Sequence, residues 1–292
     1  MRIVELLHEE LDALPCGDDA SLLSARAAVY VLDQIVSYEY TAPIRDARQR
    51  LMIVPRPRHG DQTRVAHRLD LVADDRPAER VERRVDEFGN EVVDVHADGV
   101  AASLRFSLRA LVRRDRRRPE IHEWRSPVPA VTALTQPDEA LRDAARGVAG
   151  DDVTALAERM CDLVHQAFTY RHGETGVRTT AAQAWAGRVG VCQDMAHVMI
   201  AMCASRGVAA RYVSGHLVGD GASHAWVEVH DPARRAVVSV DPTHARRTDL
   251  RYVVTAVGRD YADVAPTSGT YVSRGATGSL AVSKRIRLAD VV

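Results

Sequence analysis

Lysine, cysteine and aromatic residues are scarce in this chain of 292 residues. Lys284 is the only lysine, so arginine supplies the rest of the 39 basic residues, which nearly balance 40 acidic ones. A formal net charge of −1 gives no whole-molecule electrostatic reason to bind nucleic acid or an anionic membrane. The four cysteines are too few for a disulfide framework and lack the C-x-x-C spacing of a zinc ribbon.

Long apolar runs are also missing. The stretch from Met195 to Ala204 is far shorter than the ~18 to 20 residues that span a bilayer. Acidic residues at Glu5, Glu9 and Glu10 stand where a signal peptide needs an apolar core, so we expect a cytoplasmic protein with no membrane partner. The arginine-rich stretch 113–118 has no interleaved aromatic residues, and we expect no nucleic-acid partner.

The 46% of hydrophobic and 27% of charged residues are typical of a globular protein, and their periodicity divides the chain into three parts. Residues 1–26 show apolar residues at helical spacing and predict a helical N-terminal extension. Residues 27–118 contain short alternating runs separated by turn residues, with a hairpin at Glu87 to Glu91, and predict an antiparallel β-sandwich. Residues 119–292 begin with a linker rich in Arg and Pro, followed by helical patterns and then by strands, which is the order of an α+β domain.

Helix signals in this third part are clear. N-terminal capping residues occur three times, at Asp138, at Asp151 or Asp152, and at Thr180 with Gln183 three residues later. A fourth helix is predicted from about Cys192 to Arg206, and its apolar composition on nearly all sides predicts that it is buried. Strands are predicted at 208–218, 224–230 and 236–241.

Three residues that support nucleophilic catalysis follow one another here. Cys192 is predicted in the first turn of the buried helix, where backbone N–H groups and the helix dipole favour a thiolate and lower the thiol pKa. His224 begins a strand and Asp241 ends the next one, so a hairpin places them side by side. In such a set the imidazole takes the thiol proton, the carboxylate orients the imidazole, and N–H groups including that of Cys192 hold the oxyanion. The chemistry that this set supports is acyl transfer through a thioester.

Four sequence blocks around these residues resemble the transglutaminase-like superfamily. They are Gly190-Val-Cys192-Gln-Asp194-Met-Ala-His197, Gly207-Val-Ala-Ala-Arg211-Tyr-Val-Ser-Gly215-His216, Ser223-His224-Ala-Trp226-Val-Glu228 and Val240-Asp241-Pro242-Thr243. Further blocks at 38–43, 86–90 and 258–266 resemble the bacterial branch, whose members have a β-rich N-terminal region and are often described as cysteine proteases. The resemblance implies a papain-like core with Cys192, His224 and Asp241 as the catalytic triad.

Four further residues are candidates for binding substrate or shielding the site. Beside His224, Trp226 either shields the thiolate pair from water or is ordinary strand core. The resemblance places Tyr170 near the nucleophile, with core packing as the alternative. It also places Asp260 and Tyr261 in a loop near the cleft, with plain turn chemistry as the alternative.

A metal site is the rival explanation for the same region, because Cys192, Asp194, His197, His216 and His224 include ligand types. Cys192 and His197 are five residues apart on a helix and point to different sides, so we expect no metal. No D-x-[DN]-x-[DN]-G calcium loop is present, and no cofactor is expected.

The expected function is cysteine-dependent acyl transfer on a peptide or protein amide, with hydrolysis favoured because cross-linking needs a site that excludes water and admits lysine. Two alternatives stay open. One is a protein-glutamine transglutaminase or deamidase, and the other is a non-catalytic module that binds a peptide or protein on the same fold.

Overall fold

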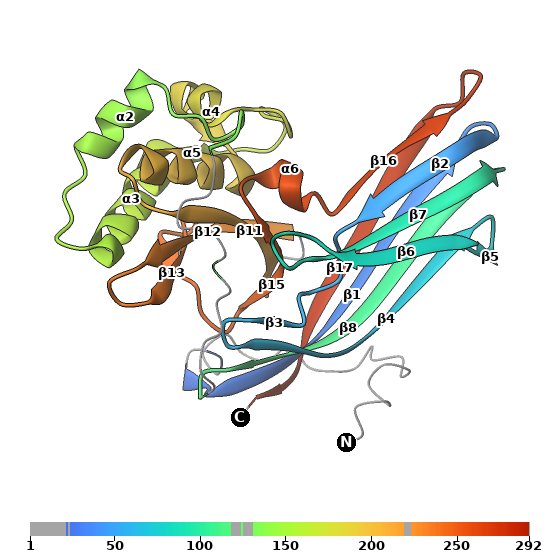
Figure 1. Cartoon of the computed structure of the whole chain (residues 1–292), viewed down its shortest axis with the longest axis horizontal. Coiled ribbons are helices and arrows are strands. Elements are labelled where there is room, and N and C mark those ends of the chain that lie inside the picture. The colour runs from blue at the N-terminus through green and yellow to red at the C-terminus, as the bar shows by residue number, and fades with distance from the viewer. Residues whose placement is uncertain (1–21, 23, 118–123, 125–130, 219–222, 292) are drawn as a thin grey trace.

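The computed structural model describes residues 22, 24–117, 124, 131–218 and 223–291, which form a β-sandwich and an α+β unit lying against each other (Figure 1). The β-sandwich comprises residues 27–115 and 267–291, and the α+β unit comprises residues 131–266. Most of the predicted N-terminal helix lies outside the described residues. Among the described helices, none is both long enough and apolar enough to cross a membrane.

The larger sheet of the sandwich is antiparallel and is built around one long strand, β1 (Ala27–Tyr40). Its strand order is β17 (Gly278–Val291), β1, β8 (Ser103–Asp115), β4 (Gln62–Ala73) and β3 (Arg58–His59), and β5 (Arg76–Pro77) pairs with β4. The smaller sheet has the order β16 (Thr267–Val272), β2 (Ile44–Leu51), β7 (Glu91–Val100) and β6 (Arg80–Val85).

The two sheets enclose a shared apolar core. Val36, Leu51 and Phe106 are fully buried in it, and each occupies an inward-facing position on its strand. β6 and β7 form the predicted hairpin, with Val85 opposite Glu91. The antiparallel sandwich predicted from the alternating runs is confirmed.

The last two strands return to the sandwich. β17 pairs with β1 from Ala28 opposite Val291 to Tyr40 opposite Gly278, and β16 pairs with β2 (Figure 1). The sequence prediction assigned residues 119–292, and with them both of these strands, to the C-terminal domain. In the structure that domain ends near residue 266, and the prediction is corrected here. The reason is that β17 pairs with a strand more than 200 residues earlier, and such pairing leaves no local sequence signal.

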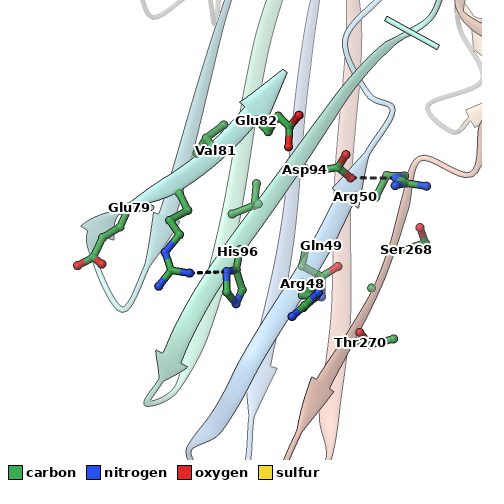
Figure 2. A pocket seen from close by; sticks show the side chains of 13 residues that line it. Arg48, Gln49, Arg50, Glu79, Val81, Glu82, Asp94, His96, Ser268 and Thr270 are labelled. Atoms are coloured by element: carbon green, nitrogen blue, oxygen red, sulfur yellow. Dashed lines mark hydrogen bonds and ion pairs between the residues drawn. The ribbon is translucent and has the colours of Figure 1, made fainter. Parts of the chain in front are cut away.

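Charged side chains line a hollow on the smaller sheet (Figure 2). Arg50 donates a hydrogen bond to Asp94 at 2.9 Å between β2 and β7, and Arg80 lies 3.0 Å from the Nδ1 atom of His96 between β6 and β7. Both contacts join neighbouring strands, so these side chains have partners within the sheet.

Four helices precede the sheet of the α+β unit: α2 (Glu139–Arg146), α3 (Val153–Ala167), α4 (Ala181–Gly187) and α5 (Cys192–Ser205). Asp138 and Asp152 accept hydrogen bonds from the first turns of α2 and α3, and Thr180 with Gln183 forms the predicted capping box of α4. From Asp194 to Cys203 every residue of α5 is buried, as its apolar sequence predicts.

The sheet of this unit is antiparallel and has the order β14 (Arg246–Arg247), β13 (Ala236–Asp241), β12 (Ser223–Asp231), β11 (Ala210–Leu217) and β15 (Tyr252–Gly258). Ala225, Val227 and Val229 pack in the core that contains α5, whereas the alternate residues Trp226 and Glu228 face the sandwich. Helices packed on an antiparallel sheet confirm the predicted α+β class.

Buried polar side chains join the two units. Gln62 of β4 accepts a hydrogen bond from the N–H of Val254 at 2.8 Å and donates one to its carbonyl at 2.7 Å. The Oε2 atom of Glu228 accepts a hydrogen bond from the Nε of Arg211 at 2.8 Å. Its Oε1 atom lies 2.7 Å from the Nε2 atom of His59. The sandwich thus holds the face of the sheet opposite the helices.

Candidate active site

The chain makes a sharp turn into α5 at Cys192. The short strand β10 (Val189–Gly190) pairs in parallel with β9 (Thr169–Tyr170), Val191 is extended, and the helix begins at Cys192. The thiol is free and partly buried. As the sequence predicts, Cys192 lies in the first turn of the helix, where backbone N–H groups lack intrahelical partners.

The carboxylate of Asp194 holds this turn. Its Oδ2 atom accepts hydrogen bonds from the N–H of Val191 at 2.8 Å and from the hydroxyl of Thr175 at 2.7 Å. Burial raises the pKa of Asp194. A Cβ atom on Gly190 would lie 2.6 Å from the same oxygen, so only glycine leaves room for the carboxylate. The capping of the turn by Asp194 is the structural device that fixes Cys192.

His224 and Asp241 meet at one end of the sheet. His224 lies near the start of β12, Asp241 ends β13, and these strands pair as the predicted hairpin. The Nε2 atom of His224 lies 2.8 Å from the Oδ2 atom of Asp241, and both side chains are buried.

Opposing influences set the charge of His224. Burial alone lowers its pKa, but hydrogen bonds with Asp241 and Cys192, together with the charge of Asp241, outweigh burial and raise the pKa to about 10. Because Nε2 faces Asp241, Nδ1 is the nitrogen left for the thiol of Cys192. The imidazole is therefore placed between a thiol and a carboxylate, and the raised pKa favours its cationic form at neutral pH.

The carboxylate of Asp241 is fully buried yet receives four hydrogen bonds. Its Oδ1 atom accepts the N–H of Thr243 at 2.9 Å. Its Oδ2 atom contacts His224, the Nδ1 atom of His244 at 2.7 Å and the hydroxyl of Tyr252 at 2.7 Å. Burial favours the neutral acid, but these partners prevail and lower the pKa of Asp241, so the group is a carboxylate.

Sequence reasoning did not single out His244 or Tyr252. His244 follows Asp241 by three residues, a spacing that a tight turn brings onto one carboxylate, and this was a readable signal. Tyr252 reaches the site from β15, which no local pattern connects to Asp241.

Trp226 lies beside His224, and Tyr170 lies on the strand that pairs with the turn into α5. The ring of Trp226 is buried and lies 6.2 Å from that of His224 and 5.3 Å from that of Tyr252, so it is both strand core and a cover on the imidazole. Tyr170 is paired with Gly190, two residues before Cys192, and is 45% exposed. Its exposure distinguishes it from core packing.

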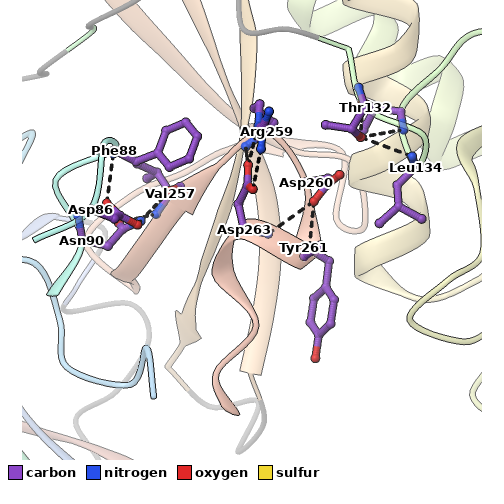
Figure 3. Close-up of polar contacts among 12 residues, drawn as sticks. Asp86, Phe88, Asn90, Thr132, Leu134, Val257, Arg259, Asp260, Tyr261 and Asp263 are labelled. Carbon is purple, nitrogen blue, oxygen red and sulfur yellow. Dashed lines mark hydrogen bonds and ion pairs between the residues drawn. The ribbon is translucent and has the colours of Figure 1, made fainter. Parts of the chain in front are cut away.

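Asp260 and Tyr261 belong to a short helix, α6 (Tyr261–Val264), next to the sandwich hairpin (Figure 3). The side chain of Asp260 caps α6 by accepting the N–H of Ala262 at 2.7 Å, which is the turn chemistry named as the alternative. The N–H of Tyr261 donates to the Nε2 atom of His197 at 3.1 Å. Burial lowers the pKa of His197 to about 4, so this histidine is a neutral acceptor.

The hairpin contact in Figure 3 also ties the sandwich to this corner. Asn90 donates to the carbonyl of Val257 at 2.8 Å and accepts the N–H of Val257 at 2.9 Å. Arg259 forms an ion pair with Asp263 and lies 5.8 Å from the ring of Phe88.

The rival metal site considered from the sequence had five candidate ligands. Within the described part of the chain, only one of them, His224, belongs to a group of side chains close enough to share a metal ion. That group is His224, Asp241 and His244, whose ligand atoms lie within 4.8 Å of one another.

Comparison with known proteins gives two matching family models. The transglutaminase-like superfamily matches residues 142–242, and the bacterial transglutaminase-like N-terminal region matches residues 30–113. An uncharacterized protein of Mycobacterium tuberculosis is 31% identical over 290 residues, which cover 87% of this chain and 91% of the relative. An uncharacterized protein of Mycobacterium leprae is 28% identical over 277 residues, which cover 86% of this chain and 96% of the relative.

The crystal structure of a putative cysteine protease from Cytophaga hutchinsonii has the same fold. It superposes with a TM-score of 0.71 at 20% identity and covers 90% of this chain and 91% of its own. Cys192, His224 and Asp241 all lie within the residues matched by the first model. The chain therefore belongs to the transglutaminase-like superfamily and carries the bacterial N-terminal region ahead of the core.

Proposed function

We propose that this protein is a cysteine-dependent hydrolase that cleaves a peptide or other amide bond through a thioester on Cys192. One observation carries the proposal: the buried carboxylate of Asp241 lies 2.8 Å from the Nε2 atom of His224, and its charge favours an imidazolium that is hydrogen-bonded to the thiol of Cys192 at the start of α5. A histidine needed only for packing has no use for a buried carboxylate on one side and a thiol on the other.

Acylation uses the protons already in place. The Cys192 thiolate attacks the carbonyl carbon of the amide, and the new oxyanion lies near N–H groups of the first turn of α5. His224 then gives its Nδ1 proton to the amine as the carbon–nitrogen bond breaks, which leaves a thioester and a neutral imidazole.

Deacylation reverses these roles. The neutral His224 takes a proton from water, the resulting hydroxide adds to the thioester, and the carbon–sulfur bond breaks to release a carboxylic acid. Asp241 supports the charge on His224 in both steps without itself taking a proton.

A peptide-digest experiment tests the proposal. The full chain and its Cys192→Ala variant are each incubated with a mixed peptide library, and the products are identified by mass spectrometry. We expect new peptide termini only with the wild type, and the carboxyl group released must take up oxygen from isotopically labelled water. Products joined to an added amine in place of water would show amine transfer, whereas identical digests from both proteins would refute a role for Cys192.

A further inference from the structure

We propose that His224, Asp241 and His244 form a zinc site that switches the candidate active site off. Their ligand atoms lie within 4.8 Å of one another, with 2.8 Å from His224 Nε2 and 2.7 Å from His244 Nδ1 to the same oxygen of Asp241. The binding of zinc follows from this geometry alone. Its effect on catalysis rests on the proposed function.

The local backbone preforms the site. After β13 the chain turns so that the N–H of Thr243 bonds to the carboxylate of Asp241 and the N–H of His244 donates to its backbone carbonyl at 3.2 Å. His165 of α3 lies 3.0 Å from the carbonyl oxygen of Thr243 and secures the turn from outside. His244 is therefore held beside Asp241 while its side chain remains 36% exposed, which gives an ion a route from solvent.

The donor set suits zinc. Two imidazole nitrogens and one carboxylate oxygen, with water in a fourth position, form a common tetrahedral zinc environment. Ligand atoms at about 2.0–2.2 Å from zinc stand roughly 3.3 Å apart, so each imidazole needs to retreat from Asp241 by only about 0.5 Å. The negative charge of Asp241 favours the cation, whereas Arg246, which donates to Tyr252 at 2.8 Å, is the nearby positive group that opposes it.

Zinc binding and thiol activation exclude each other at His224. When zinc takes Nε2 of the imidazolium, one proton is released to solvent and the remaining proton stays on Nδ1. On His244 the Nδ1 proton moves to Nε2, with no net change. With zinc on Nε2, His224 loses the direct hydrogen bond by which Asp241 orients it, and the negative charge of Asp241 is shared with the metal, so the imidazole lacks the support that the proposed mechanism requires.

A second arrangement competes with this one, because Cys192 and His224 alone could hold zinc through sulfur and nitrogen. Two variants separate the arrangements. His244→Asn removes a ligand only from the proposed site, and Cys192→Ala removes one only from the competing site. Each is made in a Cys16→Ser background, so that this thiol does not bind zinc independently.

Equilibrium dialysis with zinc chloride, with folding checked by circular dichroism, measures binding without any substrate. We expect one zinc per chain in the parent, affinity within about threefold of it in Cys192→Ala, and affinity more than about 100-fold weaker in His244→Asn. Equal binding by His244→Asn and the parent, or loss of binding in Cys192→Ala, would overturn the proposal. If the parent binds no zinc but cleaves peptides, the zinc site is overturned and the proposed function stands. If the parent binds zinc but cleaves nothing, the zinc site stands and the proposed function is overturned.

Discussion

Replacing Asp241 with asparagine is the perturbation that bears most heavily on the proposed chemistry. One oxygen of the carboxylate accepts a hydrogen bond from the N–H of Thr243. The other oxygen contacts the side chains of His224, His244 and Tyr252. An asparagine side chain offers an oxygen at only one of these positions. Its NH₂ group must therefore face a donor in either orientation, and the buried negative charge is lost.

The expected magnitude follows from these contacts. Without the charge of Asp241, burial weighs more heavily on His224 and its pKa falls, so a larger share of the imidazole is neutral at pH 7. Loss of the orienting carboxylate in a triad costs about 10³- to 10⁴-fold in rate. That loss corresponds to roughly 4 to 5.5 kcal/mol in the barrier. The unmatched buried donor should also lower the free energy of unfolding by about 1–3 kcal/mol.

The assay is the rate at which iodoacetamide labels Cys192 at neutral pH, with near-UV circular dichroism as the check on folding. Asp231→Asn is the matched control, because Asp231 is also a buried carboxylate at a strand end, where it accepts the N–H groups of Ala233 and Arg234. We expect labelling at least about 100-fold slower in Asp241→Asn and within about threefold of wild type in the control. If a folded Asp241→Asn protein labels at the wild-type rate, the reasoning about its carboxylate is refuted.

Three further predictions concern stability and the nucleophile turn. Glu228→Ala removes the buried carboxylate that contacts both Arg211 and, across the two units, His59, and should lower the free energy of unfolding by about 3–5 kcal/mol in urea. A change below about 1 kcal/mol would contradict the role of Glu228 in joining the units. Gly190→Ala forces the carboxylate of Asp194 to move and should slow thiol labelling by about 10- to 100-fold in a folded protein, and an unchanged rate would show that the turn tolerates a side chain. The raised pKa of His224 contributes stability that is complete below about pH 6.5 and is lost as the pH rises to about 10. The melting temperature of the wild type should therefore decline over this pH range. The same decline in His224→Ala would assign the effect to other groups.

The residues of the site divide according to how local their signals are. Cys192, His224 and Asp241 each occupy an element end that the sequence marks with glycine, capping or proline signals, so their placement could be predicted. Tyr252 could not be predicted, because it reaches Asp241 from β15, which pairs with β11 and not with its neighbour in the chain. For Asp194, the sequence gives a first-turn acid, but the hydrogen bond to Thr175 appears only in the folded chain.

The fold divides in the same way. Helix caps and alternating strands are local, and they located the sandwich and the buried helix α5. The return of β16 and β17 to the sandwich depends on pairing with β2 and β1, far away in the sequence. β17 also lacks a buried stripe, since nearly all of its residues are exposed or half-buried, and this weakens the pattern that marks a core strand.

The measurement that tests the central claim most directly is the rate of iodoacetamide labelling at Cys192, located by mass spectrometry, between about pH 4 and pH 9 in wild type and His224→Ala. A thiolate and imidazolium pair predicts fast labelling of wild type already near pH 6, well below the ~8.5 pKa of a free thiol, and a return to ordinary thiol behaviour in His224→Ala. Slow labelling of both proteins, rising only near the pKa of a free thiol, would contradict the pair and with it the proposed hydrolase.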